Sequence, residues 1–339
     1  MKLVDIIRND IENNKIVEDG KLPTLRQLAV RYQCGTTSVK RAFDLLEQDG
    51  IIRVVRGRGN FVIGHKDAPK QKKSKLIGTI LLNSAFMCEL AAVRDKYLQD
   101  GWLFSMYDAS FDRQSPEKEK LFLRNAMKQN FSSFIITASP IEPVNTELFM
   151  QLRANGSKVI HLSAYKEDMS DECCFLTDYE HSASLAVWKI AAANYKNILY
   201  IGRENTAPHV SKIEKGIKNT LADTGLNLID SFTVHYKESD NIIEHLQKLP
   251  PSTAILAFDT EIGEIVSWCA QRFGKSAPAD FGLVSIMEVF GVNANHSYTA
   301  GNISEIVSDV LEYAIDEKIS PLETFHKYYR NTFCDKKTL

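Results

Sequence analysis

The chain has 339 residues, of which 44% are hydrophobic and 25% charged, and its formal net charge at pH 7 is −2. This composition excludes a disordered or fibrous chain, and the length predicts two or three globular domains. No stretch approaches the roughly 18 uninterrupted apolar residues of a membrane helix. Charged residues interrupt the first 14 positions, where a signal peptide would have an apolar run, so we expect a cytoplasmic protein.

The six cysteines are scattered, with no Cys-x-x-Cys pair and no histidine nearby at ligand spacing. This pattern favours reduced thiols that pack as small hydrophobic side chains over a zinc site or a disulfide framework. We therefore expect no metal and no cofactor.

The charges are divided unevenly along the chain. Residues 1–75 contain 16 Lys and Arg against 9 Asp and Glu, a net charge of +7, which leaves −9 for residues 76–339. A small basic segment on a larger acidic body favours a polyanion as the partner of the basic segment. A net charge also serves solubility, so this signal is weak without the pattern that follows.

Three short helices are expected in the basic segment, over residues 3–16, 24–32 and 36–48, from the spacing of their apolar residues. Thr24 is the expected N-cap of the second helix, and Gly50 ends the third. The third helix has two distinct faces. Its apolar face comprises Val39, Ala42, Phe43 and Leu46, and its polar face Thr36, Thr37, Lys40, Arg41 and Asp44.

The polar face of the third helix has short hydroxyls at the helix start and cations one turn later. Hydroxyls and the helix dipole suit phosphate contacts, and the cations can reach base edges in the major groove. The alternative for the helix alone is an ordinary solvated face.

A β-hairpin is expected directly after these helices. The β-branched run 51–55 and the run 61–63 flank the turn Gly57-Arg58-Gly59-Asn60. Arg56 and Arg58 stand at its tip, and the glycines allow a close approach to the DNA backbone or minor groove. Three helices and such a hairpin describe a winged helix-turn-helix over residues 1–64.

Several short sequence motifs in this segment resemble those of a known protein family. They are Leu22-Pro23-Thr24-Leu25-Arg26-Gln27-Leu28-Ala29, Thr37-Ser38-Val39-Lys40-Arg41-Ala42, Asp49-Gly50-Ile51-Ile52 and Arg58-Gly59-Asn60-Phe61-Val62. In order and without gaps they resemble the DNA-binding domain of GntR-type bacterial regulators. The resemblance implies DNA contacts at Arg26 and Lys40 and a wing glycine at Gly59. Many members have arginine at the positions of Thr36 and Lys40, and lysine exchanges bidentate geometry for a point charge. The predicted DNA-binding residues are Arg26, Thr36, Thr37, Lys40, Arg41, Arg56, Arg58 and Gly59.

Residues 65–75 are polar and rich in lysine, which predicts a flexible basic linker. From residue 76 onward, short β-branched runs alternate with amphipathic stretches, which predicts an α/β fold with parallel sheets and helices on both faces. Two such runs, joined near 163–178, suggest two similar subdomains with a ligand in the cleft beyond the carboxyl ends of the strands. The expected strands are 76–82, 102–107, 133–137, 158–162, 198–202, 232–235, 254–258 and 281–285, and the expected helices are 87–100, 116–129, 146–155, 180–194, 210–224, 240–248 and 261–273.

The body also contains sequence motifs that resemble those of a known family, although the resemblance is weaker than in residues 1–64. They are Leu176-Thr177-Asp178-Tyr179, Ile198-Leu199-Tyr200-Ile201-Gly202, Lys215-Gly216-Ile217, Ala254-Ile255-Leu256-Ala257-Phe258-Asp259 and Asp280-Phe281-Gly282-Leu283-Val284. They resemble the effector domain of LacI-type repressors, relatives of periplasmic sugar-binding proteins. A GntR-type head on such a body is the arrangement of the arabinose-responsive repressors of bacilli. The resemblance implies a two-lobed, periplasmic-binding-protein-like domain over 76–339, with lobe one about 76–163 plus 299–317 and lobe two about 168–298 plus 318–339.

Two polar groups of the family's pocket are missing or displaced in this chain. Asp259 matches a position of a ligand-binding aspartate, but Ile213 stands at the position of an arginine, with Lys212 beside it, and Met287 at that of an aspartate, with Glu288 beside it. An unmatched buried hydroxyl costs about 1–3 kcal/mol, so the effector is either not the usual sugar or is held by a rearranged set. The predicted ligand-binding residues are Ser84, Phe86, Asp108, Tyr165, Asp178, Arg203, Lys212, Phe258, Asp259, Met287 and Glu288.

Each of these ligand-binding candidates has an alternative role in a loop, a helix cap or the core. Asp178 has a further alternative, in which it shapes the crossover between the lobes. Trp188 and Trp268 fall within expected helices, and we assign both to packing.

The leading prediction is a ligand-responsive transcriptional regulator, a homodimeric repressor that binds an operator in double-stranded DNA and a sugar or sugar derivative. The alternative is a DNA-binding regulator whose body has lost sugar binding and serves dimerisation or senses another ligand. An enzyme is disfavoured, because the sequence has no Gly-x-Ser-x-Gly elbow, phosphate-binding loop or His-Glu-x-x-His motif.

Overall fold

A computed structural model describes residues 2–13, 15–17, 20–55, 59–63, 73–82, 84–109, 114–203, 207–234, 240–289 and 292–339. Their contacts divide the chain into two compact units. The first unit comprises Met1–Leu82, Arg94–Ile160 and Leu311–Thr324, and the second comprises Asn83–Val93, His161–Val310 and Phe325–Leu339. The expected lobe boundaries stay a prediction. Within the described residues, no helix is both long and apolar enough to span a membrane.

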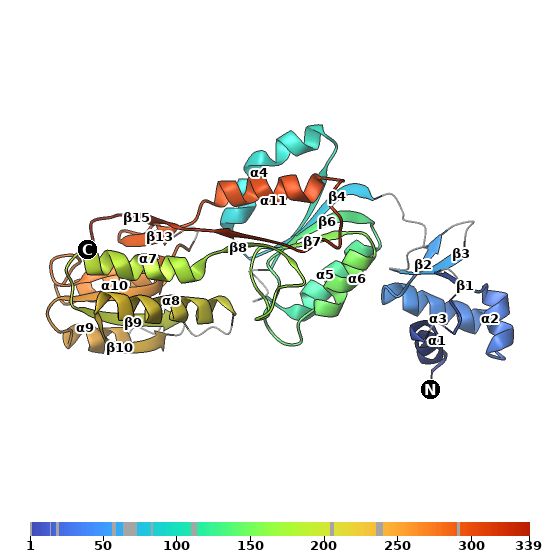
Figure 1. The fold of residues 1–339 in the computed structure, drawn as a ribbon, viewed down its shortest axis with the longest axis horizontal. Coiled ribbons are helices and arrows are strands. Elements are labelled where there is room, and N and C mark those ends of the chain that lie inside the picture. The colour runs from blue at the N-terminus through green and yellow to red at the C-terminus, as the bar shows by residue number, and fades with distance from the viewer. Residues whose placement is uncertain are drawn as a thin grey trace. The chain divides into compact units, whose positions relative to one another are not determined.

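The N-terminal domain is a winged helix (Figure 1, blue). Its elements are α1 (Leu3–Glu12), β1 (Lys21–Leu22), α2 (Leu25–Arg31), α3 (Thr36–Gln48), β2 (Ile52–Val55) and β3 (Gly59–Val62), and its antiparallel sheet has the order β1-β3-β2. The predicted winged helix-turn-helix is therefore confirmed, with α1 four residues shorter than expected at its C-terminal end.

Two local features explain this fold. Thr24 caps α2 in a capping box, because its Oγ1 accepts from the amide of Gln27 and its own amide donates to the Gln27 side chain. The apolar faces of the three helices meet in one core, in which Leu28, Val39 and Leu46 are completely buried.

The body contains two six-stranded sheets. The first has the order β14-β8-β7-β6-β4-β5, with β4 parallel to β5 and β6, and β14 parallel to β8. Its strands are β4 (Ser74–Leu81), β5 (Leu103–Asp108), β6 (Phe131–Ile136), β7 (Lys158–His161), β8 (Cys173–Thr177) and β14 (Phe325–Tyr329), and the helices around it are α4 (Ser84–Gln99), α5 (Pro116–Met127), α6 (Thr146–Ala154) and α11 (Ile303–Ile315).

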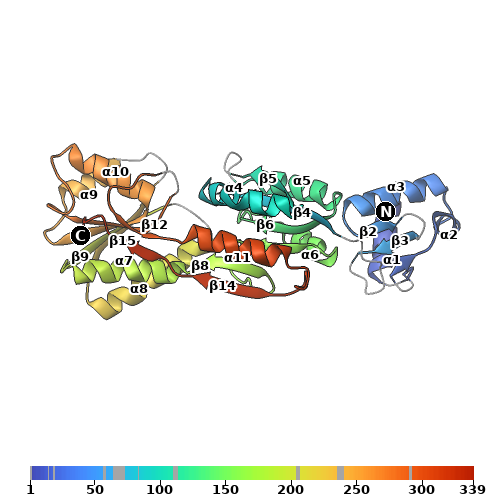
Figure 2. The same ribbon diagram turned by 90° about the horizontal axis from the view of Figure 1, so that it is seen from above.

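The second sheet has the order β10-β9-β11-β12-β13-β15 and is parallel except at β15, which runs antiparallel to β13. Figure 2 shows α7 and α8 side by side on one face, and α9 and α10 on the other. The elements are α7 (Tyr179–Ala192), β9 (Asn197–Arg203), α8 (His209–Thr224), β10 (Asn227–Val234), α9 (Asp240–Gln247), β11 (Thr253–Asp259), α10 (Thr260–Gln271), β12 (Gly282–Met287), β13 (Ser297–Ala300) and β15 (Thr332–Cys334). β11 is buried along its whole length, as a central strand covered on both faces must be.

The predicted α/β class with parallel sheets is confirmed, but several elements escaped prediction. These are β1, β8, β13, β14, β15 and α11. β8 is a five-residue run inside the segment that we expected only to join the subdomains, and β14 contains His326 and Lys327 without a β-branched pattern. Such strands form because a neighbouring strand offers hydrogen bonds, a tertiary effect that local propensity does not contain.

The assignment of two tryptophans to packing is wrong, because Trp188 and Trp268 are 50% and 55% exposed. They lie on the solvent-facing sides of α7 and α10, whereas small residues such as Ala183 and Ala186 face the core. Helical periodicity alone did not separate the two faces of these apolar helices.

Gly216 allows the close contact between α7 and α8. A Cβ atom at this position would overlap the main-chain oxygen of Glu180 and lie 3.0 Å from Cβ of Ala183. A residue with a side chain therefore does not fit at position 216 unless the two helices move apart.

We predict that Gly216→Ala lowers the free energy of unfolding by about 1–3 kcal/mol, because the added methyl forces the two helices apart. Denaturant unfolding followed by tryptophan fluorescence measures this loss. Lys218→Ala, at an exposed position of the same helix, is the control. Equal stability of Gly216→Ala and the control would show that α7 and α8 are not held at this distance.

Candidate DNA-binding surface and effector pocket

The polar face of α3 is exposed as its residue pattern predicted. Thr36, Thr37, Lys40 and Arg41 are exposed, while the apolar residues of the opposite face are buried. Arg26 is exposed in the first turn of α2. The N-cap of α3 is Gly35, whose lack of a side chain leaves the first amides of the helix without a side-chain cap. These amides and the helix dipole suit a phosphate oxygen.

The wing requires glycine at position 59. Gly59 opens β3 with φ +115°, a conformation that disfavours every other residue, and a Cβ atom there would lie 2.9 Å from Cε of Lys21. The ammonium of Lys21 lies 5.9 Å from the centre of the Phe61 ring, so β1 adds a cation beside the wing. Arg56 and Arg58 lie outside the described residues.

A pocket of about 490 Å³ lies within the second unit, where the start of α7 and the start of α8 meet. This volume is within the range of small-molecule sites, about 300–1,000 Å³. Two of the predicted ligand residues, Asp178 and Lys212, line it. The other lining residues are Ser163, Ala164, Glu167, Asp168, Met169, Ser170, Leu176, Thr177, Tyr179, Glu180, Pro208, His209, His326 and Tyr328.

Three rings in tilted contact lead from this pocket into the core. The centroid of His209 lies 5.1 Å from that of Tyr179 and 6.0 Å from that of Phe258, which is buried. Burial lowers the pKa of His209 to about 4, so the ring is neutral at pH 7. Its buried Nε2 has no hydrogen-bond partner among the described residues. Sequence reasoning missed His209 and Tyr179, although both open helices that follow a strand.

Asp259 is bound within its own chain. Its carboxylate accepts two hydrogen bonds from the guanidinium of Arg203, at 2.7 and 3.0 Å, and caps α10 through the amide of Ile262 at 2.9 Å. Arg203 also donates to Glu261 at 2.7 Å. Burial acts to lower the pKa of Arg203, but the hydrogen bonds and charges of the two carboxylates raise it overall. Three hydrogen bonds thus join the guanidinium to two carboxylates.

Met287 and Glu288 line a smaller pocket of about 90 Å³ together with Thr177 and Tyr179. β12 lies beside β11, with Met287 opposite Asp259, so the structure brings these two predicted positions to the same edge of the sheet. Burial raises the pKa of Glu288, partly offset by a hydrogen bond with Tyr298.

The remaining predicted ligand residues are placed elsewhere. The hydroxyl of Tyr165 donates to the buried carboxylate of Glu172 at 2.8 Å, which gives this residue a structural role. Phe86 is buried in α4, and Asp108 ends β5. The side chain of Ser84 lies outside the described residues. Ile213 is completely buried and belongs to the core of α8, which explains why no polar group stands at this position.

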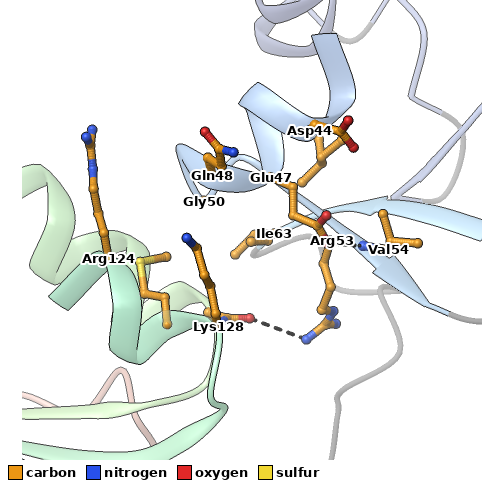
Figure 3. A pocket seen from close by; sticks show the side chains of 12 residues that line it. Asp44, Glu47, Gln48, Gly50, Arg53, Val54, Ile63, Arg124 and Lys128 are labelled. Atoms are coloured by element: carbon orange, nitrogen blue, oxygen red, sulfur yellow. Dashed lines mark hydrogen bonds between the residues drawn. The ribbon is translucent and has the colours of Figure 1, made fainter. Parts of the chain in front are cut away.

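A further pocket, of about 600 Å³, lies within the first unit between α3, β2 and α5 (Figure 3). Side chains of both signs line it, including Asp44, Glu47, Arg53 and Arg124, and Arg53 donates to Asn155 at 3.3 Å. None of the predicted ligand residues lines this pocket. No group of three or more potential metal ligands is present among the described residues.

Comparison with known proteins extends these observations. Residues 2–62 match the family described as bacterial regulatory proteins, gntR family. The arabinose metabolism transcriptional repressor of Geobacillus stearothermophilus is 19% identical over 298 residues, 84% of this chain and 80% of the relative. The repressor of the same name from Halalkalibacterium halodurans is 22% identical over 171 residues, which span less than half of either protein, 48% of this chain and 45% of the relative.

The crystal structure of a periplasmic binding ribose operon repressor protein from Lactobacillus acidophilus matches the body with a TM-score of 0.63. The match covers 79% of this chain and 99% of that one at 14% identity, so the two share the fold.

We predict that Lys40→Ala and Arg41→Ala each weaken binding to duplex DNA at least about tenfold, because a lost base-edge contact costs about 1–3 kcal/mol. Fluorescence anisotropy with a duplex selected from a random pool measures the affinity. Lys15→Ala removes the same charge outside α3 and is the matched control. Losses no larger than that of the control would contradict the assignment of α3 as the recognition helix.

We predict that the free energy of unfolding of the body decreases as the pH falls, because of His209. Its pKa in the folded state lies below the ordinary value of about 6.5, so its contribution is complete above pH 6.5 and is lost as the pH falls toward 4. At pH 5 the loss is on the order of 2 kcal/mol relative to pH 7.5. Thermal unfolding of the wild type and of His209→Phe at both pH values tests this. Parallel losses in the two proteins would contradict it.

Proposed function

We propose that this chain, a DNA-binding transcriptional regulator with a GntR-type head and a LacI-type body, is a dimeric repressor controlled by a small molecule in the pocket beside Asp178. One observation carries the proposal: the chain joins an exposed recognition face on α3 to a body that offers a ligand-sized pocket where α7 and α8 begin. A regulator of this kind acts on DNA in the cytoplasm.

The proposed mechanism is a shift between two conformations of the dimer. Two heads read two half-sites only when their spacing matches the DNA. The effector changes operator affinity if it binds the two conformations with different affinities. The pocket lies at the starts of two helices, a position from which a bound molecule biases the arrangement of α7 and α8.

The chemistry of the pocket supports an uncharged sugar or sugar derivative. Tyr179 and His209 line the pocket with aromatic rings, which suit the apolar side of a sugar, and Asp178 and Glu180 add carboxylates that can accept from its hydroxyls. Arg203 is engaged by Asp259 and Glu261 and does not line the pocket, so it supplies no cation there. The names of the related repressors, which refer to arabinose and to ribose, support the same class.

The second candidate is a regulator whose body serves dimerisation or senses a non-sugar ligand. The buried Ile213 and the apolar Met287, at two positions where the resembling family has polar groups, favour it.

We predict that an uncharged pentose or hexose raises the unfolding temperature of the protein and changes its affinity for DNA, whereas the phosphate ester of the same sugar does neither. A ligand at 100 times its dissociation constant stabilises by about 2.7 kcal/mol, which shifts the midpoint by several degrees. Differential scanning fluorimetry and DNA anisotropy with paired sugars and sugar phosphates provide the test.

Asp178→Asn is the variant for this test, because asparagine still caps α7 but lacks the carboxylate. We expect sugar affinity to fall at least about tenfold without a change in the stability of the free protein. Asp223→Asn, at an exposed position of α8, is the matched control. No response to any sugar, with intact DNA binding, would favour the second candidate.

A further inference from the structure

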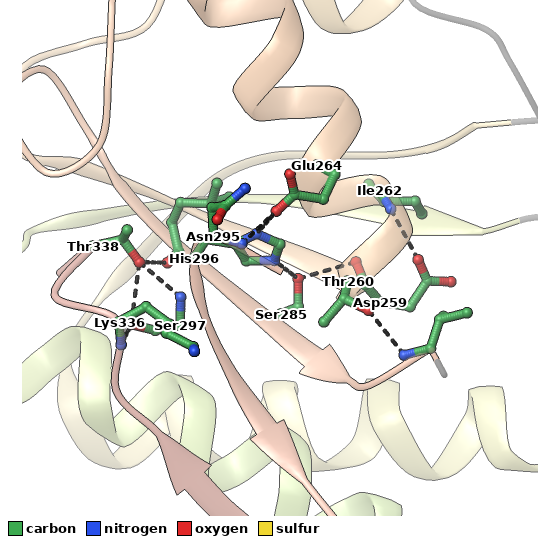
Figure 4. A network of polar contacts seen from close by, with 12 residues as sticks. Asp259, Thr260, Ile262, Glu264, Ser285, Asn295, His296, Ser297, Lys336 and Thr338 are labelled. Carbon is green, nitrogen blue, oxygen red and sulfur yellow. Dashed lines mark hydrogen bonds and ion pairs between the residues drawn. The ribbon is translucent and has the colours of Figure 1, made fainter. Parts of the chain in front are cut away.

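A buried relay of hydrogen bonds lies behind Asp259 at the carboxyl end of β11 (Figure 4). Nδ1 of His296 lies 2.9 Å from Oε1 of Glu264 on α10, and Nε2 lies 2.7 Å from Oγ of Ser285 on β12. The hydroxyl of Ser285 lies 3.0 Å from the main-chain oxygen of Asp259. Ser285 and His296 are 0% and 1% exposed, so water does not complete these contacts.

The relay has the order serine, histidine and carboxylate, as in many hydrolases, but it cannot serve as a nucleophile site. Ser285 is completely buried, and its hydroxyl faces a carbonyl group of its own chain. α10 also leaves no free space beside it. A Cβ atom at Gly263 would overlap Nε2 of His296 and lie 2.7 Å from Oγ of Ser285. The glycine is needed so that the imidazole can occupy this position, which indicates a structural task for the ring.

The structural task of the ring depends on how many protons the three contacts need. Only the Ser285 hydroxyl can donate to the carbonyl of Asp259, and only Nδ1–H can donate to a charged Glu264. The third contact then needs a second ring proton, on Nε2, with Ser285 as acceptor. Three contacts thus require three protons, whereas serine and a neutral imidazole supply two. The amide of Asn295 also donates to Glu264, which favours the charged carboxylate, so all three contacts are complete only when the ring carries the additional proton.

We infer that His296 is a proton-linked positioning residue for Asp259. With an imidazolium at position 296, Ser285 accepts from Nε2 and donates to the carbonyl of Asp259. With a neutral ring, Nε2 competes with that carbonyl for the single hydroxyl proton. The peptide between Asp259 and Thr260 then loses its anchor part of the time. This peptide sets the direction of the Asp259 carboxylate, which caps α10 and binds Arg203.

The charges around the ring and its burial shift the pKa of His296 in opposite directions. Burial lowers the pKa of His296, and the carboxylates of Glu264 and Asp259 partly restore it. Beyond these two, Arg203 and Glu261 face Asp259, and Asp335 contacts Ser297, the residue after His296. The ring is therefore largely neutral at pH 7. Lowering the pH protonates it and strengthens the hydrogen bond from Ser285 to the Asp259 carbonyl. The relay rests on these contacts and not on the proposed function.

Nuclear magnetic resonance of the full-length protein tests the relay without any ligand. We expect the ring signal of His296, assigned by comparison with His296→Gln, to titrate below pH 6.5. The amide signal of Thr260 reports on the Asp259 carbonyl and should shift with the same midpoint. A His296 ring that stays neutral wherever the protein is folded, or a Thr260 amide that does not follow it, overturns the inference.

Two variants separate the relay from general packing. Ser285→Ala removes the acceptor for Nε2–H, so the midpoint of His296 should fall by about one pH unit or more, a tenfold loss of proton affinity. Ser297→Ala removes an equally buried hydroxyl that does not touch the ring and should leave the midpoint unchanged. Equal midpoints in all three proteins overturn the inference. Failure of the sugar assay with an intact titration would instead reject the proposed effector.

Discussion

The arrangement at the carboxyl ends of the strands in the second sheet depends on the ion pair between Asp259 and Arg203. The carboxylate is 3% exposed and the pair has bidentate geometry. Removing one partner of such a buried pair costs about 3–5 kcal/mol, because the remaining charge is left unpaired. Asp259 also caps α10, so one carboxylate joins the ends of β9 and β11 to the start of a helix.

The same ion pair lies outside the lining of the proposed pocket. Arg203 ends β9 and would be the natural partner of an anionic effector, but two carboxylates already neutralise it. The lining of the proposed pocket includes aromatic rings, carboxylates and the ammonium of Lys212 near the starts of α7 and α8. Under the proposed function, these groups serve the hydroxyl groups and the apolar face of a sugar.

The head follows a simpler logic than the body. In α3 the same thirteen residues supply a buried face and an exposed face, because the 3.6-residue period separates Val39 and Phe43 from Lys40 and Arg41. Local sequence therefore determines both the packing of this helix and its exposed polar face. In the body, the candidate ligand residues come from different strands, helices and loops, so their neighbours come from distant parts of the chain.

The sequence by itself determined the winged helix, the parallel α/β class and the two faces of α3, because periodicity, capping and turn residues act over a few positions. It also placed Asp178, Lys212, Asp259 and Met287 at element ends, where ligand groups are expected. Only the tertiary structure decided that Arg203 is bound by Asp259 and Glu261, that Tyr165 is bound to Glu172, and that His209 lies between Tyr179 and Phe258. Strand β14 likewise pairs with β8, whose other neighbour is β7. Apart from the Tyr165–Glu172 pair, these contacts join residues remote in sequence, and their energies depend on burial and on the partner, which no local pattern encodes.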